Sequence, residues 1–182
     1  MLVVGGSLPI LFRSGQQAAV PPRRPLRLLD EHEYAVFAAA AARLCPGPTT
    51  VADGGATWPS AEALDCAGKV DALVALLHPR AGREFRQLLN VFENAMTGLM
   101  AIGSPRTFTR SSPDEQDARL EAWRRSRVAL FRSGYQAMKR LAHAAYYSSP
   151  EVYVLLGYPG PPVVPQSPAV PSPAPADKAV TP

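Results

Sequence analysis

The chain has 182 residues, which is enough for one domain, and alanine contributes much of its 47% hydrophobic fraction. Charged residues make up 19% of the chain, and the formal net charge is +4. This mild excess comes without a dense Lys/Arg stripe interleaved with aromatic residues, so the sequence argues against a nucleic-acid-binding protein.

Residues 1–12 form an apolar run of about the length of a signal-peptide core, too short to span a bilayer as a helix. No basic stretch precedes this run, and the nearest arginine pair follows it at residues 23–24. We expect a signal whose basic or twin-arginine part is missing; the alternative is an N-terminal arm that packs on a partner. Residues 13–26 are expected to form an extended linker because their three prolines each fix φ and remove a backbone donor.

The first helix is predicted over residues 30–44. Asp30 is a suitable N-cap, and Glu33 stands three residues later, as in a capping box. One apolar face recurs at helical spacing over Tyr34, Phe37, Ala41 and Leu44.

A second helix is predicted over residues 61–77 with Ser60 as its cap, and a third over residues 83–101. The third carries a wide apolar stripe, which predicts that its members belong to the core: Phe85, Leu88, Leu89, Phe92, Met96 and Leu99.

The fourth helix begins at the clearest cap of the chain. Ser112 is the predicted N-cap, Pro113 occupies the first helical position, and Glu115 completes a capping box. Leu120 and Trp123 are expected to face inward. A fifth helix is predicted over residues 127–147, and periodicity leaves open whether it continues the fourth.

A short last helix is predicted after Ser149, with Pro150 at its start and Gly157 at its C′ position. We therefore predict an all-α fold: a single compact bundle of about five to six helices over residues 27–162. An extended N-terminal segment of residues 1–26 precedes it, and a disordered Pro/Ala-rich tail of residues 163–182 follows.

The two cysteines, Cys45 and Cys66, allow two interpretations. They form either a reduced thiol pair or a disulfide that encloses 20 intervening residues. A loop of this size gives a stabilisation of roughly 3 kcal/mol in the chain-entropy model. Their spacing and the lack of a nearby histidine pair do not match a zinc site.

Sequence signatures of catalysis are absent. The chain contains no GxGxxG after a strand, no GxxxxGK[ST], no HExxH and no GxSxG. The three histidines are scattered, and helix capping accounts for the clustered acidic residues. We therefore predict that this chain has no catalytic, cofactor-binding or metal site of its own.

Two groups of residues are candidates for a protein interface. Basic residues stud positions 119–140, among them Arg124 and Arg125, and they form either a solvated face or a contact with an acidic partner or phospholipid. Tyrosines gather near the end of the bundle and suit either the edge of the core or an interface: Tyr146, Tyr147, Tyr153 and Tyr158.

The segment that holds these tyrosines resembles a known family. Residues 145–162, AYYSSPEVYVLLGYPGPP, are similar to the closing motif of the gluconate 2-dehydrogenase subunit 3 family. Residues 26–47 resemble the opening of that family, and FRQLLNVFE (85–93) and FTRSSPDEQDARLEAW (108–123) fit its middle. The order and spacing of these motifs carry the resemblance over most of the chain.

This resemblance implies a non-catalytic small subunit that binds, stabilises and helps to export a large flavoprotein. That partner is expected to be a sugar or sugar-acid dehydrogenase of the glucose-methanol-choline (GMC) type that holds FAD, and a cytochrome c subunit is expected to receive its electrons. The expected location is the periplasm or the periplasmic face of the inner membrane. The alternative function is a free-standing helical binding module or membrane-peripheral adaptor.

Overall fold

The computed structural model describes residues 21–45, 47 and 57–161, and this part of the chain is helical without a β-strand. The all-α prediction is therefore confirmed. The predicted apolar run and the predicted tail lie outside the described residues. The helices are α1 (Glu31–Leu44), α2 (Cys66–Ala75), α3 (Pro79–Glu93), α4 (Ala95–Ile102), η1 (Phe108–Arg110), α5 (Pro113–Arg125), α6 (Ala129–Tyr147) and α7 (Pro150–Leu156).

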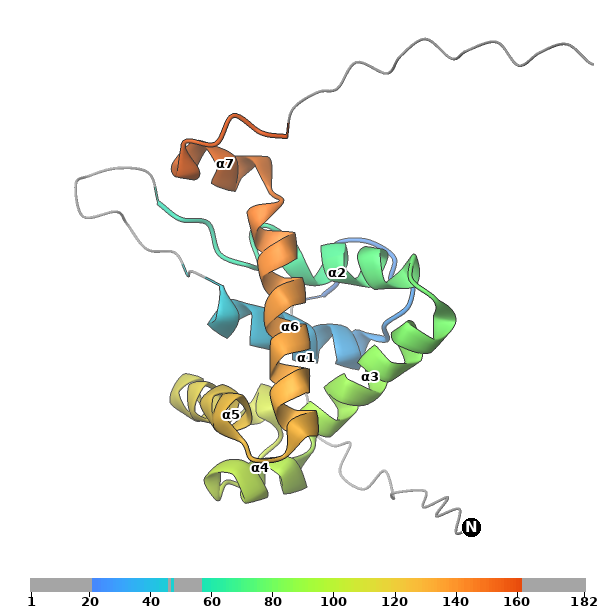
Figure 1. Ribbon diagram of the computed structural model, residues 1–182, viewed down its shortest axis with the longest axis vertical. Coiled ribbons are helices and arrows are strands. Elements are labelled where there is room, and N and C mark those ends of the chain that lie inside the picture. Colours follow the sequence, from blue (N-terminus) through green and yellow to red (C-terminus); the bar gives the residue numbers. More distant parts are fainter. Residues whose placement is uncertain (1–20, 46, 48–56, 162–182) are drawn as a thin grey trace, which may run out of the picture.

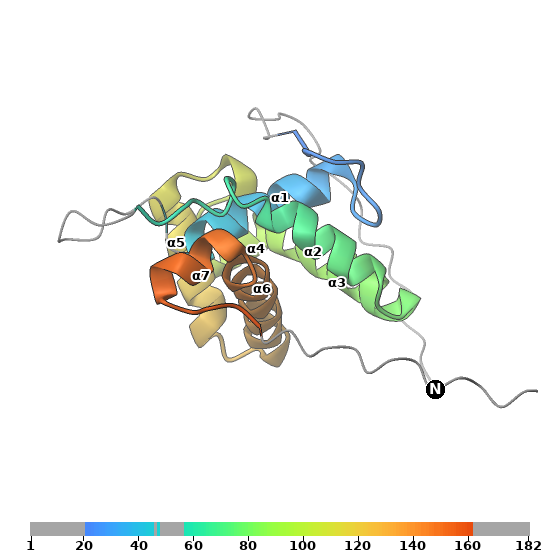
Figure 2. The same cartoon turned by 90° about the horizontal axis from the view of Figure 1, so that it is seen from above.

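The longest helix, α6, runs through the middle of the bundle and packs against α1, α2 and α5 (Figure 1). Helix α7 turns off its C-terminal end, while α4 lies at the opposite end of the molecule (Figures 1 and 2). None of the described helices has the length and apolar character that a membrane span requires. The largest fully buried apolar side chains come from α1, α3, α5, α6 and η1: Phe37, Leu89, Phe92, Phe108, Trp123, Met138 and Tyr146.

Both predicted capping boxes are present. The Asp30 carboxylate accepts from the Glu33 N–H at 2.8 Å, and the Glu33 carboxylate accepts from the Asp30 N–H at 3.1 Å. Ser112 and Glu115 make the same pair of bonds at the start of α5. These bonds satisfy N–H groups that have no partner within a helix.

Helix α2 begins five residues later than predicted. Residues 61–65 form a turn instead, closed by the Cys66 N–H, which donates to the Ala61 carbonyl at 3.0 Å. The N-cap is Asp65, in the left-handed region at φ 50°, and its side chain accepts from the Gly68 N–H. Ser60 caps the preceding turn, where its hydroxyl accepts from the Ala63 N–H at 3.0 Å. Aspartate tolerates this backbone region better than most residues, which makes the late start possible.

The predicted third helix is two helices. Asn94 interrupts the helix because its ψ is 134°, and its side chain caps α4 by accepting from the Met96 N–H at 2.8 Å. This break turns α4 away from the axis of α3, so the predicted core positions Met96 and Leu99 are 61% and 44% exposed. The core prediction is therefore wrong at these two residues.

Helices α5 and α6 are also separate, because Ser126 adopts ψ 144° and ends α5. Gly157 adopts φ 63° and terminates α7 as predicted. Ser149 does not cap α7 with its side chain. Its hydroxyl instead accepts from Lys69 Nζ at 2.6 Å and donates to the Ala145 carbonyl at 3.1 Å.

Two buried ionic side chains hold backbone segments onto the bundle. The Asp71 carboxylate of α2 accepts from the N–H groups of Arg27, Leu28 and Leu29 at 2.7, 3.0 and 2.8 Å, which docks the segment before α1. The Arg119 guanidinium of α5 is fully buried and donates to the carbonyls of Phe92 and Arg106 at 3.3 and 2.6 Å.

Candidate partner-binding surface

Tyr146 lies in the core and not on a surface. Its side chain is fully buried, and its hydroxyl donates to the Pro59 carbonyl at 2.8 Å. Burial raises the pKa of this hydroxyl to about 12. The structure therefore removes Tyr146 from the candidate interface residues, since a partner could not reach it.

Tyr147, the next residue, faces the other way and is 38% exposed. Its ring meets those of Tyr146 and His143 edge-on, with centroids 5.2 and 5.7 Å apart. The imidazole of His143 is itself fixed, because Nε2 lies 3.0 Å from the Leu44 carbonyl oxygen. Tyr147 thus exposes an aromatic ring whose orientation is fixed by its contacts with Tyr146 and His143.

The pair Tyr153 and Tyr158 is formed by the glycine that ends α7. Because Gly157 takes a left-handed conformation, the chain turns back and the Tyr158 N–H donates to the Tyr153 carbonyl at 2.9 Å. The two rings then meet edge-on at 5.1 Å. Tyr153 ties α7 to the end of α6 through its hydroxyl, which donates to the Ser148 carbonyl at 3.1 Å, whereas Tyr158 is 45% exposed.

Two further apolar residues of α7 are exposed and were not among the residues predicted for the interface. Val154 is 81% exposed and Leu156 is 51% exposed, while Val152 is fully buried. The signal was present, because a short helix of sequence PEVYVLL can bury only one of its sides. Helix α7 and the end of α6 lie at one end of the molecule (Figure 1), and we call their exposed apolar and aromatic residues, with the residue after Gly157, the α7 surface: Tyr147, Val154, Leu156 and Tyr158.

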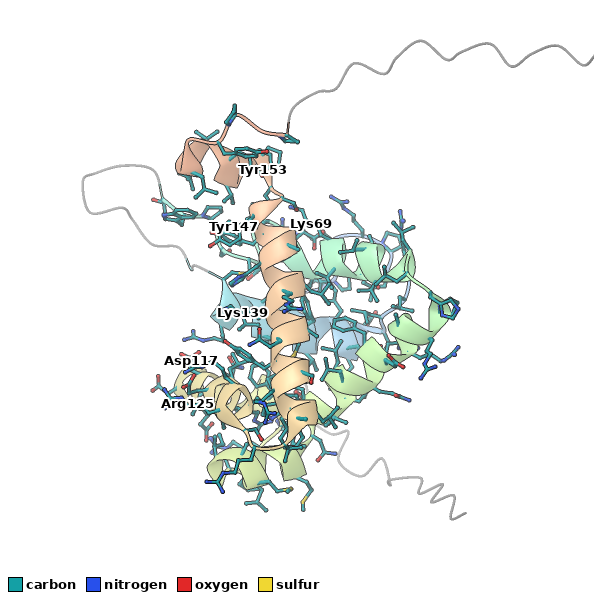
Figure 3. All side chains as sticks on the ribbon, viewed as in Figure 1. Lys69, Asp117, Arg125, Lys139, Tyr147 and Tyr153 are labelled. Carbon is teal, nitrogen blue, oxygen red and sulfur yellow. The ribbon has the colours of Figure 1, made fainter. Side chains whose placement is uncertain are left out.

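Arg124 and Arg125 are not part of this surface. They lie on α5, and Figure 3 places Arg125 far from the labelled Tyr147 and Tyr153. Both arginines are exposed and pair with Glu121 of their own helix. The hydrogen bond from Arg124 lowers the pKa of the Glu121 carboxyl. The structure therefore does not bring the arginines and the tyrosines of the candidate interface together.

A second exposed apolar group lies at the opposite end of the molecule (Figure 1). On α4, Met96, Leu99 and Met100 are 61%, 44% and 75% exposed, and we call them the α4 surface. Isolated exposed apolar residues are ordinary, but adjacent ones on a single helix indicate a place where another molecule can pack.

The structure also places Cys45 and Cys66 against each other, as free and buried thiols. Over the residues with described positions, no group of three or more His, Cys, Asp or Glu side chains could hold a metal ion.

Comparison with known proteins places these features in a family. The sequence model described as Gluconate 2-dehydrogenase subunit 3 matches residues 31–160, a span that begins with α1 and includes α7 and Tyr158. No curated protein and no solved structure matches the chain. Because the family match covers well over half of its length, the chain belongs to the gluconate 2-dehydrogenase subunit 3 family.

Proposed function

We propose that this chain is a non-catalytic small subunit that binds and stabilises the large subunit of a dehydrogenase complex. Membership of the subunit 3 family supports an accessory role in a gluconate dehydrogenase-type assembly. The finer parts of the proposal are that the large subunit is a GMC-type flavoprotein that holds FAD and oxidises a sugar or sugar acid, and that a cytochrome c subunit accepts its electrons. The complex works in the periplasm, and the small subunit assists the export of its partner.

The α7 surface is the observation that carries this proposal. Its four side chains are apolar or aromatic, they are exposed, and all lie within the segment that the family model matches. Tyrosine with aliphatic neighbours is typical of the buried centre of protein interfaces, where binding energy concentrates. Tyr147 and Tyr158 are held in place by aromatic contacts, so binding would cost little side-chain entropy.

The proposal is tested by purifying the tagged chain from its native host and recording the absorbance of the eluate. We expect a co-purifying large chain with the visible absorbance bands of a flavin. A lone, colourless protein of 19.5 kDa would contradict an obligate role as a subunit.

A pair of matched variants then locates the interface. The double variant Val154→Ser/Tyr158→Ser changes two exposed residues of the α7 surface, and Met96→Ser/Met100→Ser makes a similar change on the α4 surface. We expect the first variant to lose the flavoprotein and the second to retain it. Retention by the first and loss by the second would move the interface to α4. Circular dichroism checks that both variants keep their helical content.

A further inference from the structure

Two cysteines that are far apart in the sequence meet where three helices join. Cys45 is the C-cap of α1, and its N–H donates to the Ala41 carbonyl at 3.0 Å. Cys66 is the first residue of α2. The Cys45 thiol donates a hydrogen bond to the Ala142 carbonyl of α6 at 3.7 Å, and it lies against the Cys66 side chain. The two residues are only 6% and 1% exposed.

Backbone hydrogen bonds fix the position of Cys66 beside Cys45. The turn at residues 61–65 fixes Cys66 through its N–H bond to Ala61, and the left-handed Asp65 sets the direction in which α2 starts. Tyr146 supports the same region from α6, because its hydroxyl bonds the Pro59 carbonyl a few residues before Cys66. The contact between the thiols therefore follows from the packing of the fold and needs no further rearrangement of the helices.

We propose that Cys45 and Cys66 form an intramolecular disulfide when the chain folds in the presence of a thiol oxidant of the disulfide class, such as a disulfide-bearing oxidase or oxidised glutathione. This inference goes beyond the proposed function and does not depend on it. The bond joins the end of α1 to the start of α2 and encloses 20 residues. Burial then shields it from reducing agents.

The environment assigns different roles to the two sulfurs. Cys66 stands at the positive end of α2 and near the charge of Lys69, both of which favour a thiolate. The interaction with Cys45 lowers the pKa of the Cys66 thiol, and the charge of Lys69 acts in the same direction. The interaction with Cys66 and burial raise the pKa of the Cys45 thiol. Cys66 is thus the attacking sulfur and Cys45 the resolving one.

The reaction proceeds in two exchanges. The Cys66 thiolate attacks one sulfur of the oxidant, whose sulfur–sulfur bond breaks and releases one thiolate, which takes a proton from solvent. Cys45 then loses its proton to solvent and attacks the Cys66 sulfur, releasing the second half of the oxidant as a thiol. The chain loses two electrons and two protons, and the oxidant gains them. Because both thiols are buried in the folded chain, the exchange occurs before this region closes or during its local opening.

The first experiment follows bond formation by the full-length chain refolded across ratios of reduced to oxidised glutathione. We expect the oxidised chain to be lighter by two hydrogens, to resist alkylation at both cysteines and to yield a cross-linked Cys45–Cys66 peptide. Its Tm should exceed that of the reduced chain by roughly 6–12 °C. The Cys45→Ala/Cys66→Ala variant should melt at one temperature at every ratio. Full alkylation of both cysteines at every ratio would overturn the proposal.

The second experiment tests the roles of the two sulfurs. In Cys45→Ser, the remaining Cys66 should form a mixed disulfide with glutathione. In Cys66→Ser, the remaining Cys45 should form its mixed disulfide at least about tenfold more slowly. Equal rates, or a faster Cys45, would overturn the assignment of roles. If serine prevents folding at these buried positions, the alanine variants provide the same comparison. None of these readouts involves a dehydrogenase, so a failure here leaves the proposed function to its own test.

Discussion

The segment before α1 and the loop after α4 are both anchored by a buried ion, but the two ions have opposite signs. In the first region the Asp71 carboxylate collects three consecutive N–H groups, from residues 27–29. In the second region the Arg119 guanidinium collects two carbonyls, one near the end of α3 and one in the loop that follows α4. N–H groups before α1 have no partner within a helix, and the Asp71 anion accepts from them. The carbonyls around α4 are bound by the Arg119 cation, which donates to them.

The two anchors differ in how completely they are satisfied. Both oxygens of Asp71 accept hydrogen bonds, whereas Nε of Arg119 is buried without a partner. Burial lowers the pKa of Arg119, although the charges of Glu93 and Glu115 oppose this shift. Arg119 also needs space, because a Cβ on Gly98 would lie 2.0 Å from its Nη2. The position of the Asp71 carboxylate is fixed by its hydrogen bonds, whereas the Arg119 guanidinium fits only because Gly98 leaves room for it.

Removal of the buried cation should have the largest effect. Arg119→Ala leaves the buried carbonyl of Phe92 and the partly buried carbonyl of Arg106 without this donor, and it opens a cavity beside Phe108. We therefore expect a loss of about 3–5 kcal/mol in the free energy of unfolding. Urea denaturation measures it. Arg124→Ala on the same helix, where the arginine is exposed and pairs with Glu121, should cost less than about 1 kcal/mol. Equal losses would show that the buried contacts of Arg119 do not anchor the loop.

Removal of the buried anion should cost about 2–4 kcal/mol. Asp71→Ala leaves the N–H groups of residues 27–29 without their acceptor, and bonds to a charged group are among the stronger ones. Hydrogen exchange should show lost protection at these three amides. Asp71→Asn keeps one acceptor oxygen and should lose less. If the amides stay protected in Asp71→Ala, another group holds this segment.

The space required by Arg119 gives the next prediction. Gly98→Ala places a methyl group against the guanidinium and 2.8 Å from the Ser104 carbonyl oxygen, so it should cost about 1–3 kcal/mol. Gly47→Ala is the control, because no heavy atom lies within 4 Å of its added Cβ. In a chain that already carries Arg119→Ala, the cost of Gly98→Ala should fall, since the closest contact is gone. Strict additivity would contradict this coupling.

Buried tyrosine hydroxyls should add a smaller, pH-dependent effect. Burial is the main reason that the pKa values of the Tyr34 and Tyr146 hydroxyls are raised from 10.0 to about 12. The unfolded chain releases these protons first, so their stabilisation is complete below pH 10 and is lost as the pH rises toward 12. The urea midpoint should therefore fall over this window. Tyr146→Phe should reduce the slope, and an unchanged slope would exclude Tyr146 as a contributor.

Local chemistry made much of the fold predictable. Asp30 with Glu33 and Ser112 with Glu115 lie close in sequence, so each capping box could be read without any knowledge of the rest of the chain. Gly157 is a similar case, since a glycine after a short helix signals a left-handed residue. The candidate interface was less predictable. Tyr146 and Tyr147 are neighbours of the same type, and only the packing of α6 decides which of them is buried.

The sequence by itself determined the helical class, the starts of α1 and α5 and the family resemblance, because caps and apolar periodicity act over a few residues. Tertiary structure alone decided the break at Asn94, the late start of α2 at Asp65 and the meeting of Cys45 with Cys66. The two thiols come from segments that are distant in sequence. The two helix boundaries have local caps, but distant residues also contact them, since Arg119 donates to the Phe92 carbonyl and the Tyr34 hydroxyl donates to Asp65. A periodic pattern specifies which face of a helix is apolar, but the neighbouring helices determine which part of that face is covered.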